Sequence, residues 1–276
     1  MKRTIFNPIG TTALVTGASS GLGRGFAREL AERGADLVLT ARRQDRLEEL
    51  AVELAEKYGT VSTVIPLDLA RPGAVTELVA DLHSRDITVG TLVNNAGFGS
   101  WGDVRDSDAD RAHEQVALNV QALTDLTHAL LPDLLRTLRE RPGSAALVNM
   151  ASTAAFQPVP HMAVYGATKA FVLRFTEALW AETRAGGLKV TALCPGPVAT
   201  EFAGIAGNVH RFRRVLTVDD VMRTAFDALD LADPPPYVVS GRRNAVLARI
   251  VGVLPHRFSL GLVGRLSALG HRRPGR

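Results

Sequence analysis

Short apolar segments alternate along the chain with longer segments in which apolar residues recur every three or four positions. The short segments predict β-strands, at residues 12–16, 37–40, 61–66, 91–94, 145–150, 188–193 and 237–239. The longer segments predict α-helices, at residues 22–33, 43–58, 72–84, 108–139 and 162–184. Gly34 is expected to end the first of these helices, and Pro132 to kink or break the fourth.

Apolar strands that alternate with helices predict a parallel sheet that is covered by helices on both faces. We therefore expect an α/β fold, a Rossmann-type doubly wound parallel sheet in three layers. The 276 residues suffice for one such domain, and the sequence shows no internal repeat and no clear linker. We assign residues 1–241 to this domain and residues 242–276 to a basic, amphipathic extension that is not a separate domain.

A glycine-rich turn joins the first strand to the first helix, with the sequence Thr16-Gly17-Ala18-Ser19-Ser20-Gly21-Leu22-Gly23. Glycines permit a tight turn and let a phosphate approach the backbone, and the helix that follows offers free N–H groups and a positive dipole end. The place of the turn after the first strand of an alternating pattern strengthens the signal. It predicts a dinucleotide site that includes Gly17, Ser19, Ser20, Gly21, Leu22 and Gly23.

The end of the second strand favours a phosphorylated dinucleotide. A site for NAD usually has an acidic residue at this point, which holds the ribose 2′-hydroxyl, but this chain has Ala41. The residues that follow, Arg42 and Arg43, are suited to a charge-assisted contact with a 2′-phosphate. We therefore predict NADP(H) as cofactor, with the alternative that both arginines simply begin a solvated helix.

Polar or small residues also follow the third and fourth strands. Asp68 is suited to accept a hydrogen bond from the adenine amino group, or else it caps the next turn. Asn95, Ala96 and Gly97 let the backbone come close to the cofactor ribose, although Asn95 has an alternative structural role in tying neighbouring strands together.

Ser152, Tyr165 and Lys169 form the candidate catalytic group. Ser152 follows the fifth strand, and Tyr165 and Lys169 share one helix face because they lie four residues apart. A lone Tyr-x-x-x-Lys pattern is typical of a solvated helix surface. Here the upstream serine and the glycine-rich turn make chance a poor explanation.

From about residue 10 to 240, the chain resembles the short-chain dehydrogenase/reductase family. The resemblance rests on the glycine-rich turn, on Asn94-Asn95-Ala96-Gly97, on Asn119, on Ser152 with Tyr165-Gly166-Ala167-Thr168-Lys169, and on Pro195-Gly196-Pro197-Val198-Ala199-Thr200. It implies the strand order 3-2-1-4-5-6-7, and a homodimer or homotetramer formed through the helices near 108–131 and 162–184. It also implies a reversible hydride transfer between NADP(H) and a carbonyl or alcohol carbon.

The resemblance further implies a role for each motif residue. Tyr165 would be the general acid or base, helped by the Lys169 ammonium, which would also hold the nicotinamide ribose. Ser152 would stabilise the substrate oxygen, and Asn119 would hold a water that links Lys169 to solvent, unless it is only a polar residue within a helix. The cofactor would also be contacted by residues of the loop after strand six: Pro195, Gly196, Val198 and Thr200.

The loops that would surround the substrate supply mostly apolar side chains. The candidate walls are Phe98, Trp101, Phe156, Val159, His161, Met162, Phe202, Ile205 and Phe212. They indicate a hydrophobic carbonyl compound or alcohol, such as an aliphatic ketone, a lipid-like 3-oxoacyl group or a steroid-like molecule, although some of them are equally consistent with ordinary core. A cluster of three arginines suits either a phosphate-bearing acyl carrier or a solvated face, which we favour: Arg211, Arg213 and Arg214.

The net charge of +4 is concentrated at the C-terminus. Residues 240–276 contain eight arginines and no acidic residue, and the rest of the chain carries 24 basic and 28 acidic residues. The high isoelectric point is therefore local, and we predict no nucleic-acid binding. Apolar clusters with Arg249, Arg257 and Arg265, divided by Pro255, favour packing on the protein, with contact to a membrane surface as the alternative.

The remaining features predict a cytoplasmic enzyme. The first eight residues lack the apolar core of a signal peptide, and no apolar run is long enough for a membrane span. The single cysteine, Cys194, excludes an intramolecular disulfide and a cysteine-rich metal site, and we predict no metal. Two rival hypotheses are a cofactor-sensing regulator without turnover and a peripheral membrane protein. The complete Ser-Tyr-Lys group with Asn119 argues against the first.

Overall fold

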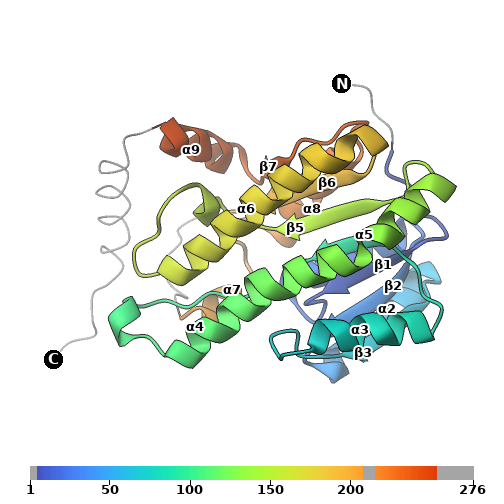
Figure 1. The fold of residues 1–276 in the computed structure, drawn as a ribbon, viewed down its shortest axis with the longest axis horizontal. Helices are drawn as coiled ribbons and strands as arrows, with labels where there is room; N and C mark the ends of the chain where they lie inside the picture. The colour runs from blue at the N-terminus through green and yellow to red at the C-terminus, as the bar shows by residue number, and fades with distance from the viewer. Residues whose placement is uncertain (1–4, 208–214, 254–276) are drawn as a thin grey trace.

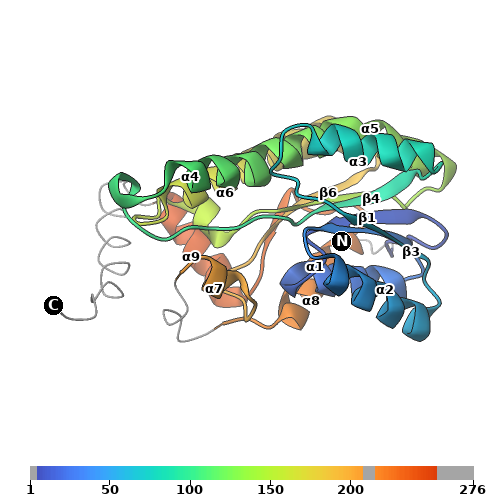
Figure 2. The same ribbon diagram turned by 90° about the horizontal axis from the view of Figure 1, so that it is seen from below.

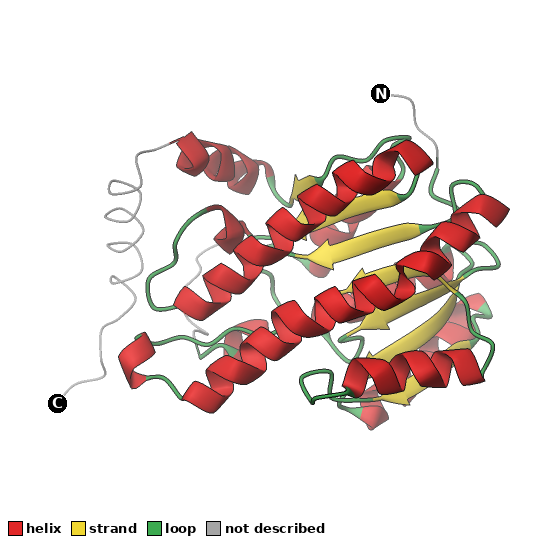
Figure 3. Cartoon of the chain, viewed as in Figure 1, coloured by secondary structure: helices red, strands yellow, loops and turns green. Residues whose placement is uncertain are grey.

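The computed structural model describes residues 5–207 and 215–253, and over these residues it contains one seven-stranded sheet (Figure 1). All pairings are parallel, in the order β3-β2-β1-β4-β5-β6-β7, which confirms the predicted strand order and fold class. The strands are β1 Thr12–Thr16, β2 Asp36–Ala41, β3 Ser62–Pro66, β4 Val89–Asn94, β5 Ala146–Met150, β6 Lys189–Cys194 and β7 Tyr237–Val239. Their arrows point to one edge, where ligands of such sheets bind (Figure 3).

Helices cover both faces of the sheet. Figure 2 shows α1, α2 and α8 on one side and α3, α5 and α6 on the other. The α-helices are α1 Gly21–Glu32, α2 Gln44–Tyr58, α3 Ala74–Ser84, α4 Ala109–Val116, α5 Leu123–Glu140, α6 Ala163–Thr183, α7 Phe202–Ile205, α8 Val218–Leu229 and α9 Arg242–Val253. Short 3₁₀ turns are η1 Val104–Asp106, η3 Thr153–Phe156 and η4 Arg184–Gly186, and η2 Ala117–Ala122 is a π-helix.

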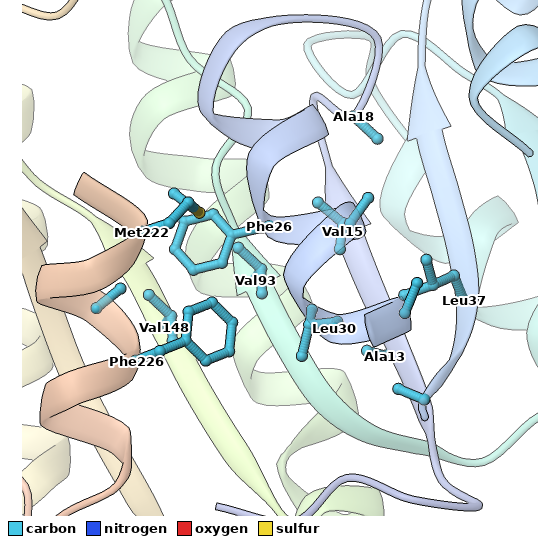
Figure 4. Close-up of a cluster of buried hydrophobic side chains, with 14 of the residues drawn as sticks. Ala13, Val15, Ala18, Phe26, Leu30, Leu37, Val93, Val148, Met222 and Phe226 are labelled. Carbon is cyan, nitrogen blue, oxygen red and sulfur yellow. The ribbon is translucent and has the colours of Figure 1, made fainter. Parts of the chain in front are cut away.

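The alternation of side chains along each strand creates two hydrophobic layers. In β1, Val15 belongs to the layer under α1, α2 and α8, whereas Leu14 belongs to the layer under α3 and α5. Figure 4 shows the first layer, in which Phe26 of α1 and Phe226 of α8 meet with ring centroids 5.9 Å apart. Each fully buried Leu or Phe contributes about 1.5–3 kcal/mol. The two layers therefore hold the strand ends, and the turns that follow them, in fixed positions.

The long helical region before β5 differs from the prediction. The helix α5 continues through Pro132, so a break there was wrong, and the irregularity lies earlier, in the π-helix η2. Pro132 and His128 are both exposed, which allows water to satisfy the carbonyl that the proline ring leaves without a helix hydrogen bond.

The start of α8 is defined by a capping box, which the sequence analysis did not use. The Thr217 hydroxyl accepts a hydrogen bond from Asp220 N at 3.1 Å, and Asp220 Oδ2 accepts one from Thr217 N at 3.1 Å. Both orphan donors at the helix start are satisfied, which fixes α8 on the sheet after the loop from β6.

The helix α9 packs against β7 and η3. The Asn244 side chain lies over Gly196, where a Cβ atom would come within 2.4 Å of Asn244 Nδ2. Among the described residues, no helix combines the length and apolar character that crossing a bilayer requires. Several residues of the sequence analysis lie outside the described ranges: Arg211, Phe212, Arg213, Arg214, Pro255, Arg257 and Arg265.

Candidate active site

The β1–α1 turn depends on glycine at each conspicuous position. Gly17 and Gly21 have φ values of +67° and +51°, the left-handed region that disfavours other residues. A Cβ atom at Gly23 would lie 2.2 Å from the carbonyl oxygen of Gly17. Only glycine therefore lets α1 begin directly against the turn, with its free N–H groups facing the edge of the sheet.

Asn95 ties β4 to this turn. Its Nδ2 donates to Thr16 O at 2.8 Å, and the backbone N–H groups of Asn95 and Ala96 both donate to Thr16 Oγ1 at 2.9 Å. The structural role that the sequence analysis considered for Asn95 is therefore present. Contact of Asn95 and Ala96 with a cofactor stays a prediction.

The basic residues after β2 are arranged asymmetrically. Arg42 is exposed, whereas the Arg43 guanidinium donates to Ser19 Oγ in the glycine-rich turn, from Nε at 3.3 Å and from Nη2 at 3.2 Å. Arg43 Nη1 also donates to Glu201 Oε2 at 2.9 Å, and Arg46 Nη1 donates to the other carboxylate oxygen. These hydrogen bonds, that from Arg46 first, lower the pKa of Glu201. Arg43 is thus bound to the predicted phosphate turn.

Asp68 is exposed at the end of β3 and caps a turn. Its Oδ1 accepts a hydrogen bond from Ala70 N at 3.1 Å, which is the alternative that the sequence analysis named. Contact with adenine stays a prediction.

The structure brings the three predicted catalytic residues together. Tyr165 and Lys169 lie on α6, and Lys169 Nζ is 5.8 Å from the centroid of the tyrosine ring. Lys169 Nζ donates to Met150 O, at the end of β5, at 2.7 Å. Ser152, which precedes η3, hydrogen-bonds Tyr165 through its hydroxyl and accepts a hydrogen bond from Ala154 N at 3.1 Å. The end of β5 therefore fixes both partners of the tyrosine.

Burial dominates the protonation of this group. Burial raises the pKa of Tyr165 to about 12, against the opposing effect of the hydrogen bond with Ser152. Burial also lowers the pKa of Lys169 to about 8, and it raises that of the neighbouring Cys194 thiol to about 12. In this arrangement the expected help from the Lys169 charge does not outweigh the cost of placing a phenolate in an apolar surrounding.

Asn119 lies in the π-helix and is completely enclosed. Its Nδ2 donates to Phe98 O at 2.9 Å and to Thr168 Oγ1 at 3.1 Å, and its Oδ1 accepts from Phe98 N at 3.1 Å. A Cβ atom at Gly97 would lie 2.8 Å from Asn119 Oδ1 and 3.4 Å from Lys169 Nζ. Gly97 thus lets both side chains approach the loop after β4, and π-helices often occur at such functional positions.

Two of the predicted substrate walls cover Tyr165. The rings of Tyr165 and Phe202 have centroids 5.5 Å apart. A Cβ atom at Gly99 would lie 3.1 Å from Phe202 Cζ, 3.1 Å from Met162 Cε and 3.2 Å from Tyr165 Cδ2. Only 8% of Tyr165 is exposed, so these side chains close over the catalytic phenol.

A second cluster forms beside this cover. The imidazole of His161 stacks on Trp101, with ring centroids 5.7 Å apart, and its Nδ1 lies 2.6 Å from Asp103 Oδ1. His161 has a φ of +66°, which is uncommon for a residue other than glycine. It is therefore held in place by neighbouring groups.

Other predicted walls lie elsewhere. Phe156 packs against Tyr237 of β7, with ring centroids 5.4 Å apart, and is partly buried against the hydrophobic core there. Ile205 is half exposed, and Val159 packs against Gly166 at the start of α6. For Phe156 the ordinary core role is the one that the structure shows.

The loop after β6 lies against the glycine-rich turn. A Cβ atom at Gly21 would come within 3.1 Å of Thr200 Cγ2, and Val198 forms a β-bridge with Leu216. Four residues of the site were given no role from the sequence, although Thr168 lies within the Tyr165–Lys169 motif and Glu201 directly follows Thr200. They are Arg46, Thr168, Glu201 and Asn244.

A family model described as short chain dehydrogenase matches residues 11–208. The chain belongs to the short-chain dehydrogenase family. This confirms the resemblance that the motifs carried, and with it an oxidoreductase that acts on alcohol or carbonyl groups.

Curated members of this family include two sulfoacetaldehyde reductases of Chromohalobacter salexigens. Sulfoacetaldehyde reductase 2 is 40% identical over 190 residues, which cover 68% of this chain and 73% of the relative. The second, sulfoacetaldehyde reductase, is 36% identical over 245 residues, which cover 85% and 93%. A solved short-chain dehydrogenase from Sphingobium yanoikuyae, in complex with NADPH, is 32% identical, with a TM-score of 0.74 and coverage of 96% of this chain and 98% of its own.

Proposed function

We propose that this short-chain dehydrogenase is an NADP(H)-dependent enzyme that interconverts a ketone or aldehyde and its alcohol. The observation that carries the proposal is the convergence of Ser152, Tyr165 and Lys169 in one buried group at the carboxyl edge of the sheet. This group lies in the same fold as the glycine-rich turn and near Asn119. A sensor without turnover has no need for such a proton-transfer group.

The residues around the turn fit a cofactor with a 2′-phosphate. The β2 strand ends in Ala41, which provides no carboxylate for a ribose 2′-hydroxyl, and Arg43 lies on Ser19. Guanidinium groups bind phosphate through charge-assisted hydrogen bonds. The NADPH in the solved relative supports the same choice.

Each catalytic side chain has a distinct task in the proposed reaction. When bound, NADPH supplies the hydride to the carbonyl carbon. Tyr165, whose pKa lies near 12, is protonated at neutral pH and donates its proton to the carbonyl oxygen. Ser152 donates a hydrogen bond to the same oxygen as charge develops on it, and Lys169 favours the resulting phenolate.

The side chains that cover Tyr165 favour a substrate with an apolar body. Phe202 packs on the catalytic ring, Met162 meets both of them around Gly99, and Phe98 is buried beside Asn119. A second candidate is a small anionic aldehyde such as sulfoacetaldehyde, because two relatives reduce it by name. Arg111 supports this candidate, since its guanidinium lies 3.8 Å from the centroid of the Phe98 ring.

The test is oxidation of NADPH, with NADH in parallel, against aliphatic ketones, aldehydes, 3-oxoacyl thioesters, steroid ketones and sulfoacetaldehyde. Tyr165→Phe should abolish turnover and leave NADPH binding nearly intact, whereas the control Tyr237→Phe should keep both. Wild-type rates in Tyr165→Phe would contradict the assignment. Tight NADPH binding without turnover on any member of the panel would favour the sensor.

Arg111→Gln separates the two substrate classes. If the substrate is a small anion, this variant should raise the KM for sulfoacetaldehyde and leave the KM for neutral ketones unchanged. An equal effect on both classes would remove Arg111 from substrate recognition.

Oligomerisation, location and the role of the extension stay proposals. On α6 the rings of Phe171 and Phe175 stack with centroids 5.8 Å apart, and Phe171 is partly exposed, which is consistent with a homodimer or homotetramer through this helix. The packing of α9 against β7 and η3 favours contact with the protein over contact with a membrane. We retain the cytoplasmic location and the division of the chain at residues 241 and 242.

A further inference from the structure

The carboxylate of Glu201 is held between two arginines of a different segment. Arg43 and Arg46, at the start of α2, each donate from Nη1 to one of its two oxygens. In the sequence, Arg43 and Arg46 precede Glu201 by 158 and 155 residues. This contact therefore joins the loop after β6 to the helix after β2.

Arg43 contacts two different groups at once, a neutral hydroxyl and a carboxylate. Its Nε and Nη2 donate to Ser19 Oγ in the glycine-rich turn, and its Nη1 donates to Glu201. Under the proposed function, this guanidinium is where a 2′-phosphate binds. A phosphate monoester carries about −1.5 to −2 charges near neutral pH and three acceptor oxygens, compared with a single charge on a carboxylate. It is therefore the stronger partner for Arg43.

Glu201 is connected directly to the cover over Tyr165. Glu201 O accepts a hydrogen bond from Ile205 N at 3.1 Å, and Phe202 O accepts one from Ala206 N at 2.9 Å, so the residue forms the first turn of α7. The ring of Phe202, the next residue, packs on Tyr165 and fills the space above Gly99. A substrate carbonyl has to come within hydrogen-bond distance of the Tyr165 hydroxyl, and because only 8% of Tyr165 is exposed, the position of the ring packed against it affects that approach.

We propose that Glu201 is a specificity-determining residue, whose carboxylate competes with a 2′-phosphate for Arg43 and thereby controls the position of Phe202 on Tyr165. A cofactor with a 2′-phosphate takes over Arg43, and Glu201 then keeps only one of these two arginines, Arg46, so that α7 is attached to α2 less tightly. A cofactor without this phosphate leaves the pair intact. The proposal rests on the proposed NADP(H) function, and it makes cofactor choice and substrate access one property.

The position of this pair distinguishes it from an ordinary surface ion pair. Pairs exposed to this degree contribute little to stability and exchange partners easily. Among the described residues, Arg28 and Glu53 form a comparable pair between α1 and α2, but neither residue touches the phosphate turn or the cover over Tyr165. Glu201 links both.

The first experiment measures binding, without any turnover, by titration calorimetry with adenosine 2′,5′-bisphosphate and with adenosine 5′-monophosphate. Glu201→Gln should tighten the bisphosphate about two- to fivefold, the range expected when an exposed ion pair stops competing, and leave the monophosphate unchanged. The control Asp81→Asn removes one carboxylate from the exposed pair with Arg85, so it reports the effect of net charge alone.

Each outcome of this titration has a separate meaning. An unchanged or weaker bisphosphate affinity in Glu201→Gln overturns the competition. An equal gain in Asp81→Asn also overturns it, because the effect is then only long-range charge. If the wild-type protein binds both nucleotides equally, the NADP(H) proposal itself is contradicted. This result is distinguishable from the two above, which concern only Glu201.

The second experiment tests the coupling to Tyr165 by hydrogen exchange at the amides of Ile205 and Ala206, whose hydrogen bonds define α7. Adding the bisphosphate to wild type should speed their exchange severalfold, and the monophosphate should not. In Glu201→Gln the exchange should be fast before any nucleotide is added. If bisphosphate leaves the exchange of wild type unchanged or slows it, the link between the phosphate and Phe202 is overturned, whatever the affinities show.

Discussion

Two regions of the molecule, one between β4, β5 and the catalytic helix α6 and one beside the glycine-rich turn, are held by different contacts. At the catalytic end, Asn94 Nδ2 donates to Asn149 Oδ1 at 3.0 Å, and Asn149 Nδ2 donates to Thr176 Oγ1 at 3.0 Å, all of them buried. At the other end, Arg43 and Glu201 form an ion pair with 39% and 42% of their side chains exposed. The hydrogen bonds of the first region join neutral side chains that are shielded from water. The ion pair of the second region joins charged side chains that are exposed to water.

The two kinds of contact differ in how easily they change partners. A buried donor that loses its partner costs about 1–3 kcal/mol, because no water replaces the bond. An exposed ion pair is worth about 0–1 kcal/mol, because water and salt compete for both charges. The catalytic end is therefore suited to hold reacting groups in position, and the arginine end is suited to change partners when an anionic group arrives.

The largest effect that we expect concerns Lys169 and pH. Its pKa in the folded protein is about 8, below the ordinary value of about 10.5, so the unfolded chain binds more protons between these values. Relative to a chain without this lysine, the free energy of unfolding should therefore rise by about 3 kcal/mol as the pH increases from 8 to 10.5, since Cys194 and Tyr165, whose raised pKa values act in the opposite direction, are common to both chains. Urea denaturation at several pH values measures this rise, and Lys169→Met should remove it. Parallel curves for the two proteins would show that Lys169 is not buried as described.

The next effect concerns the buried amides. Asn149→Ala removes one hydrogen-bond partner each from Asn94 and Thr176, together with its own buried side chain, and should lower the free energy of unfolding by about 2 kcal/mol. Chemical denaturation at one pH measures the loss. A change below about 0.5 kcal/mol would mean that the network does not distinguish the catalytic end.

A smaller effect is expected where the two regions meet. Phe202→Ala removes the ring that packs on Tyr165, so water should reach the phenol and its pKa should fall from about 12 toward the ordinary value of about 10. The absorbance of the phenolate as pH rises measures the shift. The chain has three tyrosines, so the same titration of Tyr165→Phe assigns the signal. An unchanged titration would show that Phe202 does not control the burial of Tyr165.

The smallest effect belongs to the exposed pair. Glu201→Gln should change the free energy of unfolding by less than about 1 kcal/mol, and the change should shrink at high salt. Thermal melts at low and high ionic strength measure it. A loss as large as that of Asn149→Ala would make Glu201 a structural residue and erase the contrast between the two ends.

The strands and the motif residues were predictable because their signals are local. The alternation of apolar strands and helices gave the sheet, and the observed strands begin and end within about two residues of the prediction. The spacing of Tyr165 and Lys169 placed them on one helix face without any tertiary information. The Thr217–Asp220 capping box was also a local signal, and it could have been used to predict α8.

The features of the site that were not predictable depend on contacts between segments that are distant in the sequence. Asn119 is bound to Phe98 and Thr168, 21 and 49 residues away, and no pattern around residue 119 announces a π-helix. Pro132, the strongest local helix breaker in that region, lies on an exposed face that tolerates it. The pairing of Glu201 with Arg43 likewise arises only when the ends of β2 and β6 meet at one edge of the sheet.

The π-helix η2 has a consequence for which changes of chain length the enzyme can accept. A π turn contains more residues than the α turns of α4 and α5 on either side of it. Deleting one residue here would merge the three into a continuous α-helix, in which the flanking segments stay aligned but the wide turn that carries Asn119 is lost. The amide of Asn119 would then point away from Phe98 and Lys169. Among relatives, we therefore expect insertions and deletions to avoid these six positions, even where the side chains vary freely.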